Sequence, residues 1–225
     1  GLQSETVNFS ASVSGEYRLR VYSSQQAESQ YSASLAITQL TQPTPLLLSE
    51  KKYSQPFDLV VNGSDVYWTE LAGEQDSPPG GIYTNIYGGD PSAPQTVHTT
   101  SGFSPADLTY VNTQLYFREW EHNWIARVAA TPNAPTKDVL AMGSDLALSR
   151  GIEADRVHVY WGDASSLNRQ QLADRSIEAL VTFGTTYNDV DALTADGYYL
   201  YWTETQFTVN GAFGHVHRTA KNGAS

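Results

Sequence analysis

The chain has 225 residues, no cysteine and a formal net charge of −11, with 13 Lys and Arg against 24 Asp and Glu. It is long enough to bury a hydrophobic core without disulfide or metal cross-links, and the missing cysteines exclude disulfide bonds and thiolate metal sites. The acidic excess argues against a nucleic-acid partner, and no apolar run reaches the roughly 18 residues that a membrane-spanning helix needs, so we expect no membrane insertion. Only 16% of residues are charged, and this composition favours strands, turns and a location outside the cytosol: extracellular, periplasmic or on the cell surface.

Residues 1–41 alternate apolar and polar positions without the repeat that follows them. Two or three strands are expected there, at 7–13, 17–22 and 31–37. Three strands are too few for an independent core, so this N-terminal segment packs on the rest, ends a sandwich domain, or donates strands to a neighbour in self-assembly. The chain lacks an initiator methionine and a signal-like segment, so we expect that its original N-terminus was removed.

One strand pattern recurs four times in the remaining chain. It is an alternating segment that ends in two adjacent aromatic residues, with a carboxylate two positions later. The copies recur at a spacing of roughly 40–50 residues, the period expected for propeller blades. They are Val66–Glu70, Leu115–Glu119, Val159–Asp163 and Leu200–Glu204.

Each copy belongs to a set of four expected strands. A short strand and a tight turn precede the aromatic strand, an apolar outer strand precedes that hairpin, and a further strand follows it. This order predicts an all-β fold, a β-propeller over residues 42–225 with four visible four-stranded blades. The units are placed at about 43–91, 92–133, 134–175 and 176–225.

The apolar strand Leu46–Leu48 decides how the ring of blades ends. If this strand completes the last blade, the propeller is closed and no sheet edge stays exposed. The alternative is that the chain is a piece of a longer propeller with more blades. We favour closure.

The aromatic-acid strands resemble the YWTD-type repeats of secreted and receptor propellers and the related repeats of bacterial surface proteins. The resemblance covers residues 43–223 and is nearest at Tyr67–Glu70 and Tyr201–Glu204. In that family the third strand carries an arginine, which Arg127, Arg169 and Arg218 match. Residues 1–41 also resemble the end of a bacterial pre-peptidase-type sandwich domain, through Gly15–Val21 and Tyr31–Leu35.

The recurring acids occupy one position just past each aromatic strand. They are Glu70, Glu119, Asp163 and Glu204. A ring of four carboxylates at a channel mouth could bind calcium, which prefers oxygen ligands. The alternative, which we favour, is that each acid forms a structural clamp with an arginine of the neighbouring strand, so no cofactor is expected.

A second candidate binding segment follows the second aromatic strand, where Trp120, His122 and Trp124 come close together. Exposed indoles beside polar groups can stack on sugars or bind a protein partner, because large rigid rings give contact area at a low entropy cost. The alternative is that both indoles pack between blades.

No nucleophile elbow, phosphate-binding glycine loop or metal-binding His-Glu-x-x-His helix is present. The leading hypothesis is therefore a secreted or surface-displayed, non-catalytic module for recognition or assembly, which binds a protein or glycan. Two alternatives stay open: a propeller lyase or hydrolase with a metal at the channel mouth, and a structural subunit of an extracellular filament or coat. The expected docking face consists of the loops at 71–80, 119–124, 162–166 and 205–213.

Overall fold

The computed structural model describes residues 55–71, 79–86, 92–99, 104–143, 150–183 and 187–223, together with residues 47, 89, 90 and 102. The chain divides into two units, Gly1–Thr44 and Pro45–Ser225, and every described residue belongs to the second. The strands expected within residues 1–41 and most of the loop at 71–80 lie outside the described residues. None of the described segments forms a helix long and apolar enough to cross a membrane.

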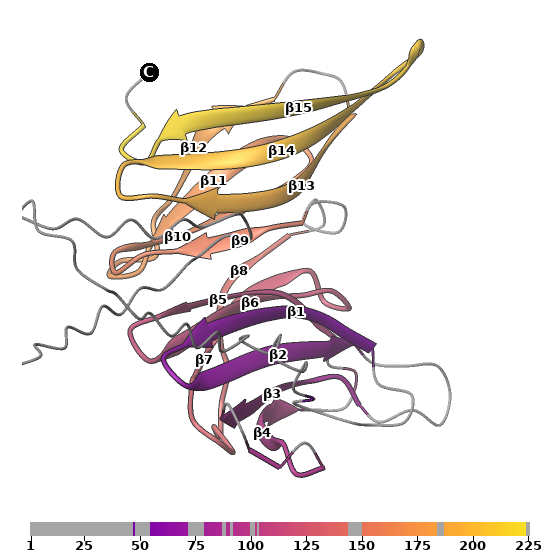
Figure 1. Cartoon of the computed structure of the whole chain (residues 1–225). Coiled ribbons are helices and arrows are strands. Elements are labelled where there is room, and N and C mark those ends of the chain that lie inside the picture. The colour runs from indigo at the N-terminus through magenta and orange to yellow at the C-terminus, as the bar shows by residue number, and fades with distance from the viewer. Residues whose placement is uncertain are drawn as a thin grey trace, which may run out of the picture. The chain divides into compact units, whose positions relative to one another are not determined.

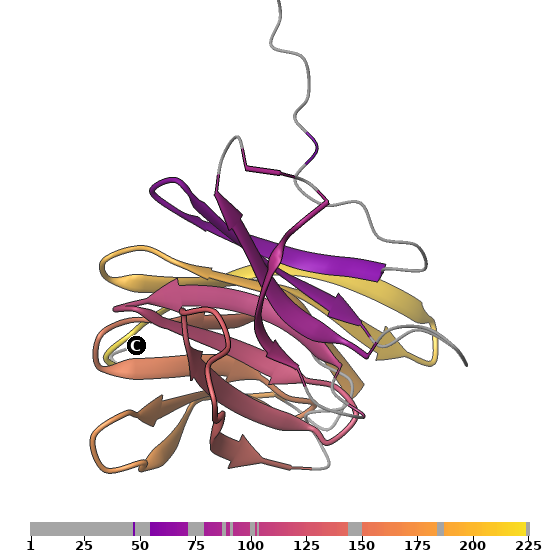
Figure 2. The ribbon, with the colours of Figure 1, turned by 90° about the horizontal axis from the view of Figure 1, so that it is seen from below.

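The described residues form four antiparallel sheets, in which strands that follow one another in sequence are neighbours. The sheets succeed one another in chain order, from purple to yellow in Figure 1, and Figure 2 shows the same sheets from below. The first sheet contains β1 (Gln55–Asn62), β2 (Asp65–Leu71), β3 (Gly81–Ile86) and β4 (Gln95–Thr99). The second contains β5 (Pro105–Val111), β6 (Gln114–Glu119), β7 (Trp124–Ala129) and β8 (Asp138–Met142). The third contains β9 (Ile152–Ala154), β10 (His158–Gly162), β11 (Ser166–Gln171) and β12 (Ile177–Thr182), and the fourth contains β13 (Tyr187–Ala195), β14 (Tyr199–Thr208) and β15 (Gly211–Ala220).

Each of the first three sheets packs against the sheet that follows it in the chain, so the second and third sheets are covered on both faces. Successive residues of a strand point to opposite faces, so the adjacent aromatic pair supplies both contacts. The tyrosine packs forward and the tryptophan or phenylalanine packs backward. The three shared clusters join Tyr67 and Ile82 to Leu115 and Phe117, Tyr116 and Ile125 to Val159 and Trp161, and Tyr160 and Leu167 to Leu200 and Trp202. Full burial of each such side chain contributes about 1.5–3 kcal/mol, so these clusters hold neighbouring sheets together.

Three of the four first strands contain an irregularity at the same place. The pairing with the second strand shifts between Pro56 and Leu59 in β1, between Pro105 and Leu108 in β5, and between Val190 and Ala192 in β13. An extra residue at such a bulge bends the strand and redirects its side chains. These bulges lie where the first strands meet the cavity described below.

The all-β propeller architecture predicted from the repeat is confirmed. Within the described residues, the last sheet has one strand fewer than the four that were predicted. The fourth sheet contains three strands within the described part of the chain. Of the expected closing strand Leu46–Leu48, only Leu47 is described, and it lies outside any strand with 52% of its surface exposed. The strand at Thr96–Val97, which opens the second unit of the sequence, is the last strand of the first sheet. The sequence repeat and the sheets are therefore offset by one strand.

Candidate functional site

The first strands of all four sheets surround one cavity of about 540 Å³. Four of its lining residues are acidic and one is an arginine: Asp58, Asp107, Glu153, Asp191 and Arg150. The beginning of each first strand pairs with the end of a second strand, as in Gln55 with Leu71 and Pro105 with Glu119. The cavity therefore lies beside the loops that follow the second strands.

Two of the acids connect neighbouring first strands through backbone hydrogen bonds. Asp58 Oδ2 accepts the backbone N–H of Leu108 in the second sheet at 2.8 Å, while its Oδ1 accepts that of Leu59 at 2.8 Å. Asp107 in turn accepts the backbone N–H of Gly151, beside β9 of the third sheet. Carboxylate acceptors form stronger hydrogen bonds than neutral ones, so these bonds fasten sheet to sheet at the cavity wall.

A buried arginine lies beside Asp107. The Oδ2 atom of Asp107 has no hydrogen bond, and Arg118 Nη1 lies 4.0 Å from it. Burial raises the pKa of Asp107, while the hydrogen bond from Gly151 and the charge of Arg118 act in the opposite direction. Burial likewise lowers the pKa of Arg118. Asp107 and Arg118 thus both lose the stabilisation that water gives to their charges, and their mutual attraction compensates for only part of this loss.

The fourth sheet adds two more carboxylates. Asp191 Oδ2 accepts a hydrogen bond from Thr205 Oγ1 at 2.7 Å, and the side chain stays exposed. Asp189 has a buried Oδ1 without a hydrogen bond, and burial followed by repulsion from Asp191 raises its pKa. Perturbed carboxyl groups beside a cavity are typical of functional sites, although structural ion networks also produce them.

The rim of the cavity contains the first of the two predicted tryptophans. Trp120 contacts Phe57 edge to face with ring centroids 5.7 Å apart, and the Arg150 guanidinium lies 5.6 Å from each ring centre. Trp120 thus belongs to a contact between three sheets, which agrees with packing between blades and leaves the indole partly exposed.

The second tryptophan belongs to a different cluster. Trp124 stacks on His122 at 4.5 Å, and Lys137 Nζ lies 4.6 Å from its ring centre. His122 Nδ1 and Lys137 Nζ both contact the fully buried Glu119, at 2.7 and 3.2 Å. His122, Trp124 and Glu119 therefore lie together, whereas Trp120 faces the cavity rim.

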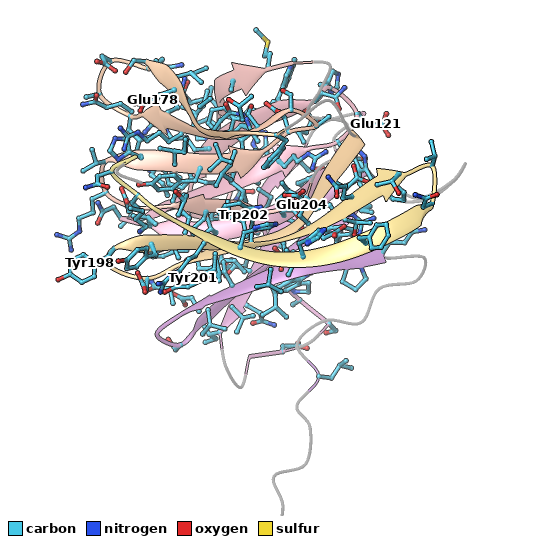
Figure 3. All side chains as sticks on the ribbon, turned by 90° about the horizontal axis from the view of Figure 1, so that it is seen from above. Glu121, Glu178, Tyr198, Tyr201, Trp202 and Glu204 are labelled. Atoms are coloured by element: carbon cyan, nitrogen blue, oxygen red, sulfur yellow. The ribbon has the colours of Figure 1, made fainter. Side chains whose placement is uncertain are left out.

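The other recurring acids are bonded inside their own sheets. Glu70 Oε1 accepts the indole N–H of Trp68 at 2.9 Å, and Glu204 Oε2 accepts that of Trp202 at 3.3 Å. Asp163 instead holds the turn before β11, where it accepts the backbone N–H groups of Ser165 and Ser166 and the amide of Asn168. Figure 3 shows Trp202 and Glu204 on the inner side of the fourth sheet.

The expected arginine clamps are wrong. Arg127 pairs with Asp138 at 3.0 Å, Arg169 pairs with Glu178 at 2.9 Å, and Arg218 lies over the ring of Tyr199 at 4.9 Å. The four acids are held by other groups. Tryptophan indoles bind Glu70 and Glu204, His122 and Lys137 bind Glu119, and Asp163 is bonded within its own turn. Within the described ranges, no group of three or more His, Asp or Glu side chains is placed to hold a metal ion.

The cavity residues were not predicted from the sequence; they are Asp58, Asp107, Arg150, Glu153 and Asp191. A signal was present, because an aspartate opens the expected inner strand in three of the four units, at Asp58, Asp107 and Asp191. A polar residue that recurs at the start of an otherwise apolar strand indicates a common environment. Here that environment is the cavity.

No protein-family model and no curated protein sequence matches the chain. Among solved structures, the chain is similar to a chain of a nidogen/laminin complex, with a TM-score of 0.50, 18% identity, and coverage of 71% of this chain and 62% of that one. It is also similar to the extracellular domain of a putative one-component system from B. thetaiotaomicron, with a TM-score of 0.49, 14% identity, and coverage of 72% and 22%. The chain thus spans less than two thirds of either structure. The first likeness supports the β-propeller fold.

Proposed function

We propose that the protein is a non-catalytic recognition module, which binds a protein partner at the face around the central cavity by accepting a cationic side chain. The observation that carries the proposal is the charge of the cavity lining, with four carboxylates and one guanidinium. A lysine or arginine can extend its aliphatic stem into a pocket and place its charge among carboxylates. The cavity volume falls within the range of about 300–1,000 Å³ typical of binding pockets.

The arrangement of the acids supports a binding role over a purely structural one. Asp58 and Asp107 are used to fasten sheets, but Asp191 is exposed and its one hydrogen bond comes from a threonine hydroxyl. Asp189 nearby has a buried oxygen without a hydrogen bond. Arg118 and Arg150 offset part of this negative charge, but the four acids that line the cavity outnumber its one arginine, so a cationic ligand would relieve the remaining repulsion.

The proposal also includes a location outside the cytosol and a relation to YWTD-type propellers. Residues 43–223 resemble YWTD-type repeats, which occur in secreted and receptor propellers, and the composition favours a place outside the cytosol. The nidogen/laminin complex is an assembly of proteins, and its likeness to this chain supports a propeller that binds a protein.

Calorimetric titration with a tri-lysine peptide at low salt tests the cavity directly. We expect the wild-type protein to bind this peptide and to ignore a tri-glutamate peptide. Asp191→Asn keeps the acceptor for Thr205 and removes one charge, so it should weaken tri-lysine binding about three- to tenfold, the effect of one partly screened charge pair.

The matched control is Asp174→Asn, which removes the same charge from an exposed turn before β12 and keeps the acceptor for Ser176. This control should bind tri-lysine as the wild type does. Equal loss in both variants would mean that the peptide responds only to net charge, and the cavity proposal would be wrong.

A further inference from the structure

A guanidinium and a carboxylate start from neighbouring points of the cavity wall. Arg150 and Asp191 both line the cavity, and each stands two residues before the residue that pairs with the tryptophan of its sheet. Those pairing residues are Ile152 and Leu193. The backbone N–H of Arg150 donates to the Val190 carbonyl at 2.5 Å, directly before Asp191. The two charged side chains therefore leave adjacent stretches of backbone, at equivalent positions of the third and fourth sheets.

Aromatic rings, not a carboxylate, position the Arg150 side chain. Its guanidinium lies 5.6 Å from the ring centres of both Phe57 and Trp120, and the side chain is exposed. Within the described residues, no carboxylate lies close enough to form an ion pair with it, and its charge acts on Asp107 and Asp189 only from a distance. An aromatic face attracts a cation without occupying its N–H donors, so the donors of this guanidinium stay available to a ligand.

Asp191 is also held in place and keeps acceptor capacity. It stands at the bulge of β13, where the pairing with β14 shifts between Val190 and Ala192, and a bulge redirects the side chain of its extra residue. Its Oδ2 accepts the hydroxyl of Thr205 at 2.7 Å, and the side chain is exposed. An ionised carboxylate has about four acceptor positions, so one hydrogen bond leaves room for an ammonium group.

The neighbouring positions of Arg150 and Asp191 fit a ligand group that carries both charges. We propose that the partner enters the cavity with a C-terminal lysine, whose side-chain ammonium binds Asp191 while its terminal carboxylate accepts two N–H groups from Arg150. A guanidinium binds a carboxylate in this forked geometry better than a single ammonium can. The inference rests on the proposed function and names the part of the partner that the cavity recognises.

An internal lysine of the partner fits the same wall less well. It supplies only a cation, so it gains the attraction of Asp191 but meets the like charge of Arg150 beside it, and like charges at close range repel. A C-terminal lysine turns that repulsion into a second attraction, because its carboxylate faces the guanidinium. The exposed arginine in an otherwise acidic cavity thus has a role in selecting the end of a chain.

Calorimetric titration of the full chain with three acetylated tripeptides tests the inference. They are acetyl-Gly-Gly-Lys with a free terminal carboxylate, the same peptide with a terminal amide, and acetyl-Lys-Gly-Gly with a free carboxylate. The amide has the most positive net charge, so a cavity that selects positive charge alone would bind the amide most tightly. We expect the reverse, with acetyl-Gly-Gly-Lys acid bound about tenfold more tightly than the amide, the effect of one charge-assisted pair. Acetyl-Lys-Gly-Gly has the same charges farther apart and should also bind more weakly than acetyl-Gly-Gly-Lys acid.

Two arginine variants assign the preference to its residue. Arg150→Gln should abolish the preference for the free acid, whereas Arg156→Gln, which removes the same charge from the exposed turn between β9 and β10, should keep it. Asp191→Asn should weaken binding of the acid and of the amide alike.

The comparison of acid with amide on the wild type needs no variant, so it decides the inference even if Arg150→Gln does not fold. An amide that binds as tightly as the acid, or a preference that survives in Arg150→Gln, would overturn the C-terminal lysine and leave the cation-binding cavity standing. If none of the lysine peptides binds, the proposed function fails and this inference fails with it.

Discussion

At the scale of single residues, two aspartates hold the tight turns between the first and second strands. Asp155 Oδ1 accepts the backbone N–H groups of Val157 and His158 at 2.9 and 2.8 Å, and its Oδ2 accepts the hydroxyl of Tyr160 at 2.8 Å. Asp196 repeats this arrangement five residues before Tyr201. Although burial opposes ionisation of Asp155, these hydrogen bonds and Lys221 keep its pKa below the usual range.

This lowered pKa predicts that the turn stabilises the fold in a pH-dependent way. A carboxyl group whose pKa is lower in the folded state contributes stability above its unfolded pKa of about 3.9, and loses it as the pH falls through the folded value. Asp155→Ala should therefore cost about 1 kcal/mol at pH 7, because the site is partly exposed and screened.

Urea unfolding at pH 7 and below the folded pKa of Asp155 measures the difference between wild type and variant. We expect the gap in unfolding free energy to shrink in acid, where the wild-type carboxylate is protonated. A gap that stays constant or widens would show that the charged hydrogen bonds do not stabilise this turn.

At the scale of elements, β9 and β13 approach so closely that a glycine is required between them. Gly151 has a φ of 90°, and a Cβ atom there would lie 2.7 Å from the backbone nitrogen of Leu193. The neighbouring Arg150 N–H donates to the Val190 carbonyl at 2.5 Å. The third and fourth sheets thus meet backbone to backbone at the cavity wall.

Gly151→Ala should consequently destabilise the protein by about 2 kcal/mol or more, from backbone strain and the clash with Leu193. Gly197→Ala is the matched control, since its Cβ would meet nothing within 4 Å. Thermal unfolding of both variants separates the two effects. If Gly151→Ala and Gly197→Ala unfold at the same temperature, the close approach of β9 and β13 is incorrect.

The strands and turns were predictable because their signals are local. The aromatic pairs identify the second strands, and the turn at Asn112 and Thr113 has the positive φ values of 50° and 62° that such a short hairpin requires. The partners of the arginines were not predictable. Arg127 pairs with Asp138 on the adjoining strand, and that contact depends on a register that the spacing of the repeats does not determine.

At the scale of the whole propeller unit, function depends on residues that are distant in sequence. Asp58 and Asp191 come from the first and fourth sheets, yet both line one cavity. The sequence predicts a docking face at the loops after the second strands and includes Trp120 in it, but it does not bring the acids together, because their convergence follows from the packing of successive sheets.

The most direct test of the central claim, that the carboxylates around the cavity recognise a positive charge, is the coupling between Asp191 and the charge of the ligand. Calorimetry would compare tri-lysine with its acetylated form on the wild type and on Asp191→Asn. The account predicts that the wild type prefers tri-lysine by about tenfold or more and that Asp191→Asn reduces this preference several-fold. An equal preference in both proteins would contradict it.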